Sequence, residues 1–458
     1  MPPRALAPRR PTLSRIPLPR PRLYAILLGA GLPIALGVVS PAFLWIAVAI
    51  IVVALVLAAV DAASTPRPER VPVTRVAEPQ LSIGVPNRVV LRVLNPFARP
   101  LRAVLVDAVP PSFDVDRRRL SVTIPPAATA GDQNPAVDVE YVARPHHRGT
   151  FAFGDVALRV RGPLDLVEKQ GHIASAATAN VYPDLHEIRR YEVSLRRGLA
   201  YDAGQRRARL PGAGSIFERL REYVPDDDPR SISWTATARR GRPITVEYET
   251  ERQQRIQILL DAGRMMSSTL GGLTKLDHAV NTALMLSYVA IAKGDEVGLL
   301  GFADTVRGYA IPRRGRRQFL RLTEELRKIE VTTTEPDYRA AFEFLRARSG
   351  RRSLVVLFTD LVDEDASRAL VAAVTRLAGH NLVLCCLLAD PQLAETASRR
   401  PRSTQELFEK VVAEDVRDAR QRALAILRQR GVHTIDVPAE RLTVATIQRY
   451  VELKRRSL

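Results

Sequence analysis

Two aspartates stand at the ends of two apolar runs, where their carboxylates could do chemistry: Asp261 in "ILLDAG" and Asp360 in "VLFTDL". The segment between them includes "VTTTEPDYRAAF", which places Thr334 and two further threonines ahead of a helical pattern. Carboxylate and hydroxyl oxygens gathered at one sheet edge suit a hard divalent cation such as Mg²⁺. The candidate metal ligands are therefore Asp261, Thr334 and Asp360.

The elements that would bring these residues together lie in residues 253–458. Continuous apolar runs such as "RIQILLD" and "RSLVVLFTD" alternate there with helical patterns such as "LDHAVNTALMLSYVAIAKG". Alternating strands and helices with fully apolar strands predict an α/β domain with a doubly wound, mainly parallel sheet covered on both faces. Sites in such sheets form beyond the carboxyl ends of the strands, where both aspartates are expected.

This arrangement resembles the von Willebrand factor A (vWA) domain, in which the first strand ends in Asp-x-Ser-x-Ser and a Thr and a later Thr-Asp pair complete the metal site. Residues 261–265 instead read Asp-Ala-Gly-Arg-Met, so both serine positions are lost. The sequence leaves open a retained Mg²⁺ and a metal-free descendant of the site, and it favours the second. Two carboxylates at one edge repel unless a positive charge lies between them. We hypothesise that Arg264 supplies that charge; the alternative is that Arg264 points to solvent.

Residues 66–185 have a different pattern. Short runs with period-two alternation, among them "VVLRVLN", "LRAVLVD" and "VDVEYVA", are separated by Pro, Gly and Asn turns. This pattern predicts an antiparallel β-sandwich domain ahead of the α/β domain. The adjacent His146 and His147 lack further ligands nearby in the sequence, so we interpret them as surface residues and not as a metal pair.

The N-terminus predicts membrane attachment. Residues 1–22 are rich in Pro and Arg and are expected to form a disordered basic tail. Residues 23–60 hold two charge-free apolar runs joined by Ser-Pro, each about 25–29 Å long as a helix, which predicts a two-helix transmembrane hairpin. Arginines flank both ends of the hairpin, so both ends are predicted to lie in the cytoplasm. The expected location is the inner (plasma) membrane, with two spans and a cytoplasmic globular part.

The connector, residues 186–252, contains "LREYVPDDDPRSISWTATARRGRPITVEYETE". It is similar to the signature of the bacterial family called domain of unknown function 58: Leu-Arg-x-Tyr, Pro-Gly-Asp, Arg-x-Ile-Asp-Trp, Ala-Arg and then a Glu. Asp226 replaces the usual Gly, and Ser233 replaces the Asp before the Trp. The resemblance covers about residues 20–455. The signature positions are Arg221, Tyr223, Asp227, Arg230, Trp234, Arg239 and Glu251.

The family resemblance implies a membrane-tethered adaptor or scaffold with a vWA-like domain. Members are commonly encoded beside an AAA+ ATPase of the MoxR type and are thought to act with it in the assembly or maturation of protein complexes. The expected partners are therefore that ATPase and, through residues 23–60, the membrane. The alternative is a cation-dependent, vWA-type ligand-binding module in cell-envelope assembly. Neither reading names a client or fixes an oligomeric state.

The connector itself admits three interpretations. Catalysis would need a nucleophile beside a base or two tuned carboxylates, and the seven histidines of the chain are dispersed. We therefore expect no enzymatic activity and no bound cofactor. The favoured interpretation is structural: Arg230 and Arg239 pair with carboxylates above a buried Trp234 and dock the connector against the α/β sheet. A partner-binding surface is compatible with it.

A net charge of +19 often indicates that a soluble protein binds nucleic acid. Here the basic residues are scattered, are not interleaved with aromatics and match no nucleic-acid-binding motif, so we expect no nucleic-acid partner. Only six of the 68 basic residues are lysines. The two cysteines, Cys385 and Cys386, are neighbours on one predicted strand, so they should point to opposite faces as small buried residues.

Overall fold

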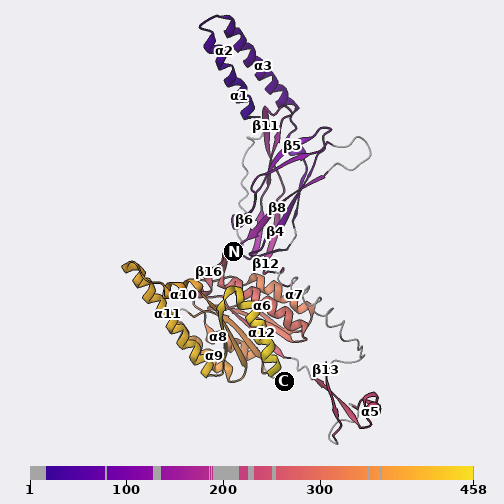
Figure 1. Cartoon of the computed structure of the whole chain (residues 1–458), viewed down its shortest axis with the longest axis vertical. Coiled ribbons are helices and arrows are strands. Elements are labelled where there is room, and N and C mark those ends of the chain that lie inside the picture. The colour runs from indigo at the N-terminus through magenta and orange to yellow at the C-terminus, as the bar shows by residue number, and fades with distance from the viewer. Residues whose placement is uncertain are drawn as a thin grey trace. The chain divides into compact units, whose positions relative to one another are not determined.

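The chain divides into two compact units, Met1–Tyr182 and Pro183–Leu458 (Figure 1). The structure, a computed structural model, describes residues 17–77, 80–126, 136–184, 186, 188, 216–224, 232–249, 254–348, 351–361 and 364–456.

The first unit begins with apolar helices. α3 (Ala42–Ser64) has 23 residues and is long and apolar enough to cross a membrane. Alongside it run α1 (Pro21–Gly29) and α2 (Gly31–Leu36), which form a shorter apolar segment interrupted at Ala30 (Figure 1). The described residues thus contain one helix of membrane-spanning length where the sequence analysis expected two. The structured part also starts earlier than expected, because Leu18 and Pro19 of the predicted tail form strand β1.

Small side chains let the apolar helices lie close together. Ala47, Ala54 and Ala58 are buried on one face of α3, whereas Trp45 on another face is 76% exposed. A stripe of alanines allows two helix backbones to approach, as in helix pairs in membranes. Asp61 continues the same face one turn further on and is completely buried.

Asp61 fastens α3 to the β-strands. Its carboxylate accepts hydrogen bonds from the backbone N–H groups of Leu164 (2.8 Å), Leu166 (2.9 Å) and Val167 (3.0 Å). Leu164 and Leu166 lie in the turn between the adjacent strands β10 (Val156–Arg161) and β11 (Val167–Ile173), and Val167 begins β11. A side chain at Gly162 would collide with the Asp61 carboxylate, so the turn closes around it only with glycine there. A buried carboxylate without a cation is thereby satisfied by backbone donors.

The strands of the first unit form three sheets among the described residues. Every pair is antiparallel except β3 with β12. The largest sheet has the order β1 (Leu18–Pro19), β11 (Val167–Ile173), β10 (Val156–Arg161), β5 (Leu101–Asp107) and β7 (Leu120–Ile124). The second has the order β2 (Val73–Ala77), β4 (Asn87–Leu94), β8 (Ala136–Pro145) and β6 (Phe113–Val115). The third has the order β3 (Gln80–Ser82), β12 (Ala177–Tyr182) and β9 (Gly149–Phe153). A short 3₁₀ turn, η2 (Pro68–Arg70), precedes β2.

A buried ion pair links these three sheets. Arg75 of β2 lies 2.5 Å from the Asp107 carboxylate of β5, and the Tyr141 hydroxyl of β8 donates to the same carboxylate at 2.6 Å. The guanidinium of Arg75 also stands 4.8 Å from the ring centre of Phe153 in β9. Burial and the charge of Asp107 raise the pKa of Tyr141 well above its usual value, so its hydroxyl stays a donor. The antiparallel sheets are therefore joined through one polar cluster inside the unit.

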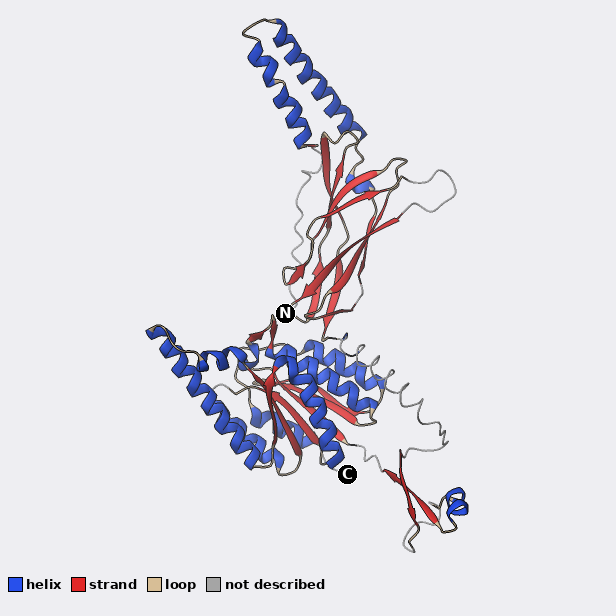
Figure 2. Ribbon diagram, in the orientation of Figure 1, coloured by secondary structure: helices blue, strands red, loops and turns tan. Residues whose placement is uncertain are grey.

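The second unit contains a six-stranded sheet (Figure 2). Its order is β19 (Val306–Arg313), β18 (Glu296–Phe302), β15 (Arg255–Asp261), β20 (Leu354–Thr359), β21 (Leu382–Ala389) and β22 (His433–Pro438). All neighbours are parallel except β18 with β19. The predicted parallel-rich sheet is confirmed, and its central strands are buried on both faces, which explains their unbroken apolar sequences.

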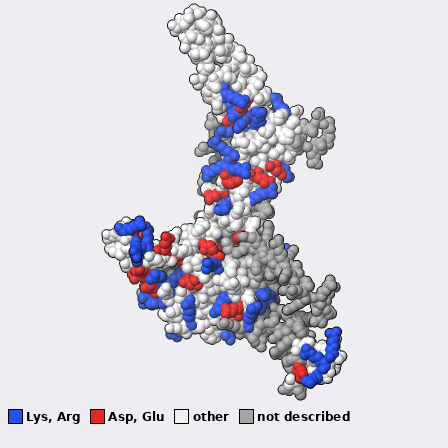
Figure 3. Space-filling view, in the orientation of Figure 1, with Lys and Arg blue, Asp and Glu red and all other residues white. Residues whose placement is uncertain are grey.

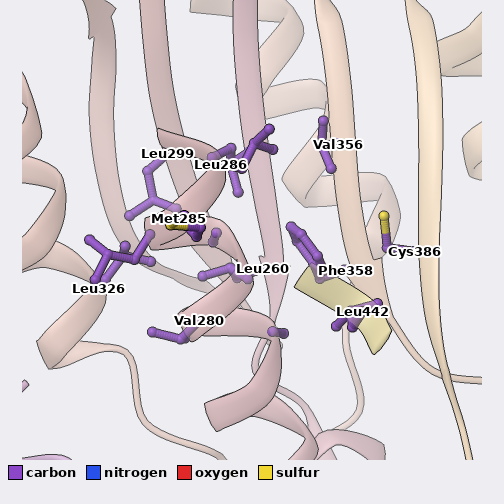
Figure 4. Close-up of a cluster of buried hydrophobic side chains, with 14 of the residues drawn as sticks. Leu260, Val280, Met285, Leu286, Leu299, Leu326, Val356, Phe358, Cys386 and Leu442 are labelled. Carbon is purple, nitrogen blue, oxygen red and sulfur yellow. The ribbon is translucent and has the colours of Figure 1, made fainter. Parts of the chain in front are cut away.

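Helices cover both faces of this sheet (Figure 2). One face carries α6 (Lys275–Ala292), α7 (Arg316–Lys328) and α12 (Ala439–Arg456). The other carries α8 (Tyr338–Arg348), α9 (Glu364–Ala378) and α11 (Thr404–Gln429), which follows α10 (Pro391–Ser398). Leu260, Phe358 and Cys386 lie in the first core (Figure 4), whereas Cys385 lies in the second. The cysteines are both buried on opposite faces, as predicted.

Candidate functional site at the carboxyl edge of the parallel sheet

The two predicted aspartates lie on neighbouring parallel strands. β15 ends at Asp261, and Asp360 follows directly after β20. Strand order reverses at β15, because the next strand of the sheet in chain order, β18, lies on one side of it and a later strand, β20, on the other. Crevices at such a reversal are the usual binding places of open α/β sheets. The fold therefore brings Asp261 and Asp360 to the position where a site would form.

Asp261 is held by neutral donors. It is 1% exposed, and its Oδ2 accepts hydrogen bonds from the hydroxyls of Thr359 (2.6 Å) and Tyr338 (2.9 Å). Its Oδ1 accepts the backbone N–H of Gly263 at 2.8 Å. Burial raises the pKa of Asp261, and these hydrogen bonds offset only part of that rise. Among the described residues no cation forms a salt bridge with Asp261.

Asp360 has the opposite environment. Its side chain is fully buried, with Lys275 Nζ 2.5 Å from Oδ2 and Arg420 Nη1 2.5 Å from Oδ1. The backbone N–H of Leu361 adds a bond of 2.8 Å to Oδ1. Each oxygen of Asp360 therefore already has a positively charged partner from the chain.

Arg420 extends this network across the sheet edge. It reaches Asp436 at 2.7 Å and donates to the carbonyls of Leu361 (3.1 Å) and Leu388 (2.9 Å). Burial alone would lower the pKa of Arg420, but the charges of Asp360 and Asp436 outweigh it and raise that pKa above its usual value. A guanidinium with carboxylates and carbonyls on several of its N–H groups is fixed in place.

Arg264 does not lie between the two aspartates. It begins the short 3₁₀ helix η4 (Arg264–Ser267), and its side chain is 56% exposed and pairs with Glu335 at 3.1 Å. The hypothesis that Arg264 supplies the missing charge is wrong, because Lys275 and Arg420 supply it at Asp360. The sequence analysis missed Lys275, although it is one of only six lysines in the chain.

Lys275 is positioned by the start of α6. Two short strands, β16 (Thr269–Leu270) and β17 (Leu273–Thr274), lead into that helix. The Thr274 hydroxyl and the Asp277 carboxylate form a reciprocal capping box, which fixes the first turn. Lys275 is the first helical residue and is only 4% exposed. The cap therefore holds its ammonium group against the sheet edge.

Thr334 faces a different carboxylate. Its hydroxyl bonds to Asp304 at 3.2 Å and to Thr332 at 2.9 Å, and the Thr332 hydroxyl donates to the carbonyl of Ala262 at 3.1 Å. In the described part of the chain, Thr334 forms no hydrogen bond with Asp261 or Asp360. The three predicted metal ligands therefore do not converge in the described part of the chain.

The residues at this edge do not fit a divalent cation. Both oxygens of Asp360 are engaged by cations, and those of Asp261 by three hydrogen-bond donors. A serine ligand at position 263 has no room, since a Cβ there would lie 2.8 Å from Pro336 Cδ. Mg²⁺ requires free oxygen ligands, so we derive no chemistry through a metal here.

The connector signature falls on a separate hairpin. β13 (Ile216–Glu222) pairs antiparallel with β14 (Ile244–Glu249), and α5 (Trp234–Arg240) lies between them in sequence. Ser233 caps α5 by accepting the N–H of Ala236 at 3.4 Å. Ser and Asp serve equally as N-caps, which explains how Ser233 replaces the family's usual Asp.

The tryptophan of the expected network is not buried, and Arg230 of that network lies outside the described residues. Trp234 is 72% exposed, and Arg239 is exposed as well. The backbone N–H of Tyr223 donates to the Pro243 carbonyl at 3.0 Å, and Arg221 pairs with Thr245 in the strand register. Of the remaining signature positions, Asp227, Arg230 and Glu251 lie outside the described residues.

Comparison with known proteins gives a family but no activity. The model of the family described as "Protein of unknown function DUF58" matches residues 219–397. "Uncharacterized protein Rv1480" of Mycobacterium tuberculosis (strain ATCC 25618 / H37Rv) is 26% identical over 266 residues, which cover 54% of this chain and 82% of that protein. "Uncharacterized protein YeaD" of Bacillus subtilis (strain 168) is 24% identical over 218 residues, which cover 48% of this chain and 52% of that protein.

Among solved structures, the match to proximal thread matrix protein 1 from the mussel byssus covers 43% of this chain and 46% of that chain, with 12% sequence identity. Its TM-score is 0.26, which is too low to establish a common fold.

Proposed function

This chain belongs to the family described as "Protein of unknown function DUF58", and we propose that it is a membrane-tethered adaptor, not an enzyme. In this proposal it works with an AAA+ ATPase of the MoxR type in the assembly or maturation of protein complexes. The ATPase is the partner that the family resemblance implies. We also propose that the parallel-rich sheet is a vWA-like domain and the antiparallel sheets a β-sandwich.

The observation that carries the proposal is the state of the sheet edge. The place where an α/β fold usually binds a ligand is filled by Lys275, Asp360 and Arg420, with every charge paired. Asp261 is buried and bound to neutral donors, so it offers no exposed base. A sheet edge whose charged groups are all paired favours a rigid binding surface. It offers no exposed nucleophile or base for catalysis.

A partner surface is available on α11. Its first three turns expose four large apolar side chains, with Phe408 69% and Val412 60% exposed; the others are Leu407 and Val411. Apolar side chains grouped on one exposed helix face are typical of protein-binding surfaces. We assign this face to the ATPase.

Membrane attachment in this proposal uses two spans. α3 crosses the bilayer, and α1 with α2 returns across it, so that residues before Pro21 and after Ser64 lie on the cytoplasmic side. Reporters fused before Pro21 and after Thr65 should both report cytoplasm. A reporter after Thr65 found outside the cytoplasm would overturn this topology.

The adaptor proposal is tested with the full chain in a mild detergent and the purified MoxR-type ATPase of the same organism. We expect direct binding and a change in ATP hydrolysis rate. Phe408→Asp with Val412→Asp should abolish both, whereas Val444→Asp, which alters an apolar residue 55% exposed on α12, should not. Absence of binding by the wild type would contradict the proposal.

The alternative, a cation-dependent ligand-binding module in cell-envelope assembly, needs a metal at Asp261 and Asp360. The donor set there does not fit one, so the alternative has no supporting contact at this edge.

A further inference from the structure

The base of the apolar hairpin is a junction of several chain segments. Before α1, strand β1 pairs with β11, and the Arg20 N–H donates to the Leu166 carbonyl at 2.8 Å. After α3, Lys169 of β11 donates to the Thr65 carbonyl at 2.8 Å. The chain therefore enters and leaves the hairpin beside the same strand, β11.

The proposed membrane position places this junction at the lipid headgroups. α3 is about 34 Å long, which matches the hydrocarbon core of about 30 Å. Its last turn holds Asp61, and Asp61 binds the turn between β10 and β11. At the tip of that turn Leu164 is 45% exposed, an apolar side chain level with the end of the membrane helix.

Basic residues lie at the junction on the face shown in Figure 3. The apolar hairpin is white in this view, and Lys and Arg side chains gather where it meets the strands. The basic residues of the junction, which we call the basic collar, are Arg20, Arg22, Arg67, Arg70, Arg161 and Lys169.

Acidic residues neutralise only part of the basic collar. Asp165 pairs with Arg20 and Arg22, Glu168 pairs with Arg20, and Glu69 of η2 acts on Lys169. Arg67 and Arg70 are exposed, and neither has an ion-pair partner among the described residues. The Nε of Arg161 is buried without a hydrogen-bond partner. The basic collar therefore keeps positive charge at Arg67 and Arg70 and a hydrogen-bond donor without an acceptor at Arg161.

Like charges lie near one another in the basic collar. Burial lowers the pKa of Lys169 and the charge of Arg67 lowers it further, while the charge of Glu69 offsets only part of this fall. Burial likewise lowers the pKa of Arg20, with Arg161 contributing. Neighbouring cations with few carboxylates are stabilised when an anion lies between them. At headgroup depth, the anion in reach is a lipid phosphate.

We propose that the basic collar binds the phosphate of an anionic phospholipid, with Arg67, Arg70, Arg161 and Lys169 facing the headgroup and Leu164 entering the edge of the acyl region. This inference rests on the proposed membrane position of the hairpin. The anionic cytoplasmic leaflet would supply the lipid. Each Lys or Arg at such a surface changes lipid affinity about fivefold.

The test uses the full chain in nanodiscs of phosphatidylcholine alone or with phosphatidylglycerol, and native mass spectrometry of the lipid retained. We expect the wild type to retain phosphatidylglycerol in preference to phosphatidylcholine. Arg67→Gln with Arg70→Gln should reduce that preference about 25-fold. Arg67 and Arg70 are both exposed, so the substitutions should not destabilise the fold. The control, Arg346→Gln with Arg441→Gln, removes the same charge from exposed positions on α8 and α12 and should leave the preference unchanged.

The outcomes separate the two proposals. Insertion into phosphatidylcholine nanodiscs with equal retention of both lipids overturns the headgroup site and leaves the membrane hairpin standing. Failure to insert overturns both. If inorganic phosphate displaces phosphatidylglycerol from the nanodisc-bound protein at equal concentration, the site recognises a free anion, and the lipid assignment is wrong.

Discussion

The ammonium nitrogen of Lys275 lies 2.5 Å from Oδ2 of Asp360, and both side chains are buried. Arg420 binds the other oxygen at the same distance. Two elements distant in sequence, the start of α6 and the middle of α11, thus meet on one carboxylate. A metal at this position would have to displace a buried ammonium group that has no other hydrogen-bond acceptor among the described residues.

Lys275→Met should strongly destabilise the second unit. Removing one member of a buried charge network costs about 3–5 kcal/mol, because the remaining charges lose their compensation. The control is Lys328→Met, which removes an exposed pair with Glu325 and should cost less than about 1 kcal/mol. Equal urea midpoints for the two variants would contradict the assigned role of Lys275.

The cysteines provide the measurement for that comparison. Cys385 and Cys386 are fully buried in β21, and burial raises the pKa of Cys386 to about 12 and that of Cys385 further. A thiol reagent at pH 8 should therefore not react with either thiol in the native protein, and should label both when urea unfolds the sheet. Rapid labelling of the native wild type would show that β21 is not buried as described.

Asp261 and Asp360 should respond oppositely to replacement by Asn. Asp261→Asn keeps hydrogen-bonding groups toward Gly263, Thr359 and Tyr338, so stability at pH 7 should be unchanged or higher. Asp360→Asn leaves Lys275 and Arg420 short of a charge and should cost about 3–5 kcal/mol. In a metal site both changes would abolish binding alike.

The pH dependence distinguishes the two residues further. The folded-state pKa of Asp261 is raised, so its contribution to stability is fully present below the unfolded pKa and is lost as pH rises through the folded pKa. The wild type should therefore lose this increment of stability on going from acid toward neutral pH, and Asp261→Asn should not. Thiol labelling in urea at several pH values measures this change in stability. If stability varied with pH in the same way for the two proteins, the pKa of Asp261 would not be raised.

Magnesium and manganese should not bind at this edge. Calorimetric titration of the wild type with either ion up to millimolar concentration should give no saturable heat, and a chelator should leave the urea midpoint unchanged. The reason is that the oxygens of Asp261 and Asp360 are already occupied. Saturable binding that Asp360→Asn removes would make the alternative, cation-dependent function the leading one.

Arg75→Ala should destabilise the first unit. Arg75 is buried with Asp107 and touches all three sheets through its neighbours, so its loss should cost about 3–5 kcal/mol. Arg92→Ala on β4 removes an exposed bidentate pair with Asp138 of β8 and should cost less than about 1 kcal/mol. Hydrogen exchange of β4 and β5 amides in the full chain measures the difference. Similar exchange in both variants would rule out the joining role of Arg75.

Trp234 and Arg239 should tolerate substitution. Both are exposed on α5, so Trp234→Ala and Arg239→Ala should leave thermal stability within about 0.5 kcal/mol of the wild type. Loss of ATPase binding by either variant at unchanged stability would mark α5 as a recognition surface. A clear fall in stability would instead restore the docking network expected from the sequence.

Periodicity was sufficient to predict the sheet and the position of its aspartates. β15 and β20 are uniformly apolar because helices cover both their faces, and the carboxyl ends of parallel strands meet at one edge. Their cationic partners could not be predicted in the same way. Lys275 and Arg420 lie 85 and 60 residues from Asp360, so only the packing of α6 and α11 brings them to it.

The positions of the Arg264 and Trp234 side chains were predicted wrongly for a related reason. Arg264 is three residues from Asp261, yet η4 directs its side chain outward to Glu335. Trp234 belongs to a residue type that is usually buried, but its hairpin exposes it. Proximity in sequence and average burial are local quantities, whereas the orientation of a side chain depends on the turn that carries it.

Asp61 fixes the end of α3 to the antiparallel sheets of the first unit. Its hydrogen bonds to the turn between β10 and β11, together with β1 and Lys169 on either side, leave no loose hinge among the described residues of the junction. A tilt of α3 therefore turns the antiparallel sheets with it as one body. If α3 lies in a bilayer as proposed, a change in bilayer thickness that alters the tilt of α3 would also change the orientation of those sheets.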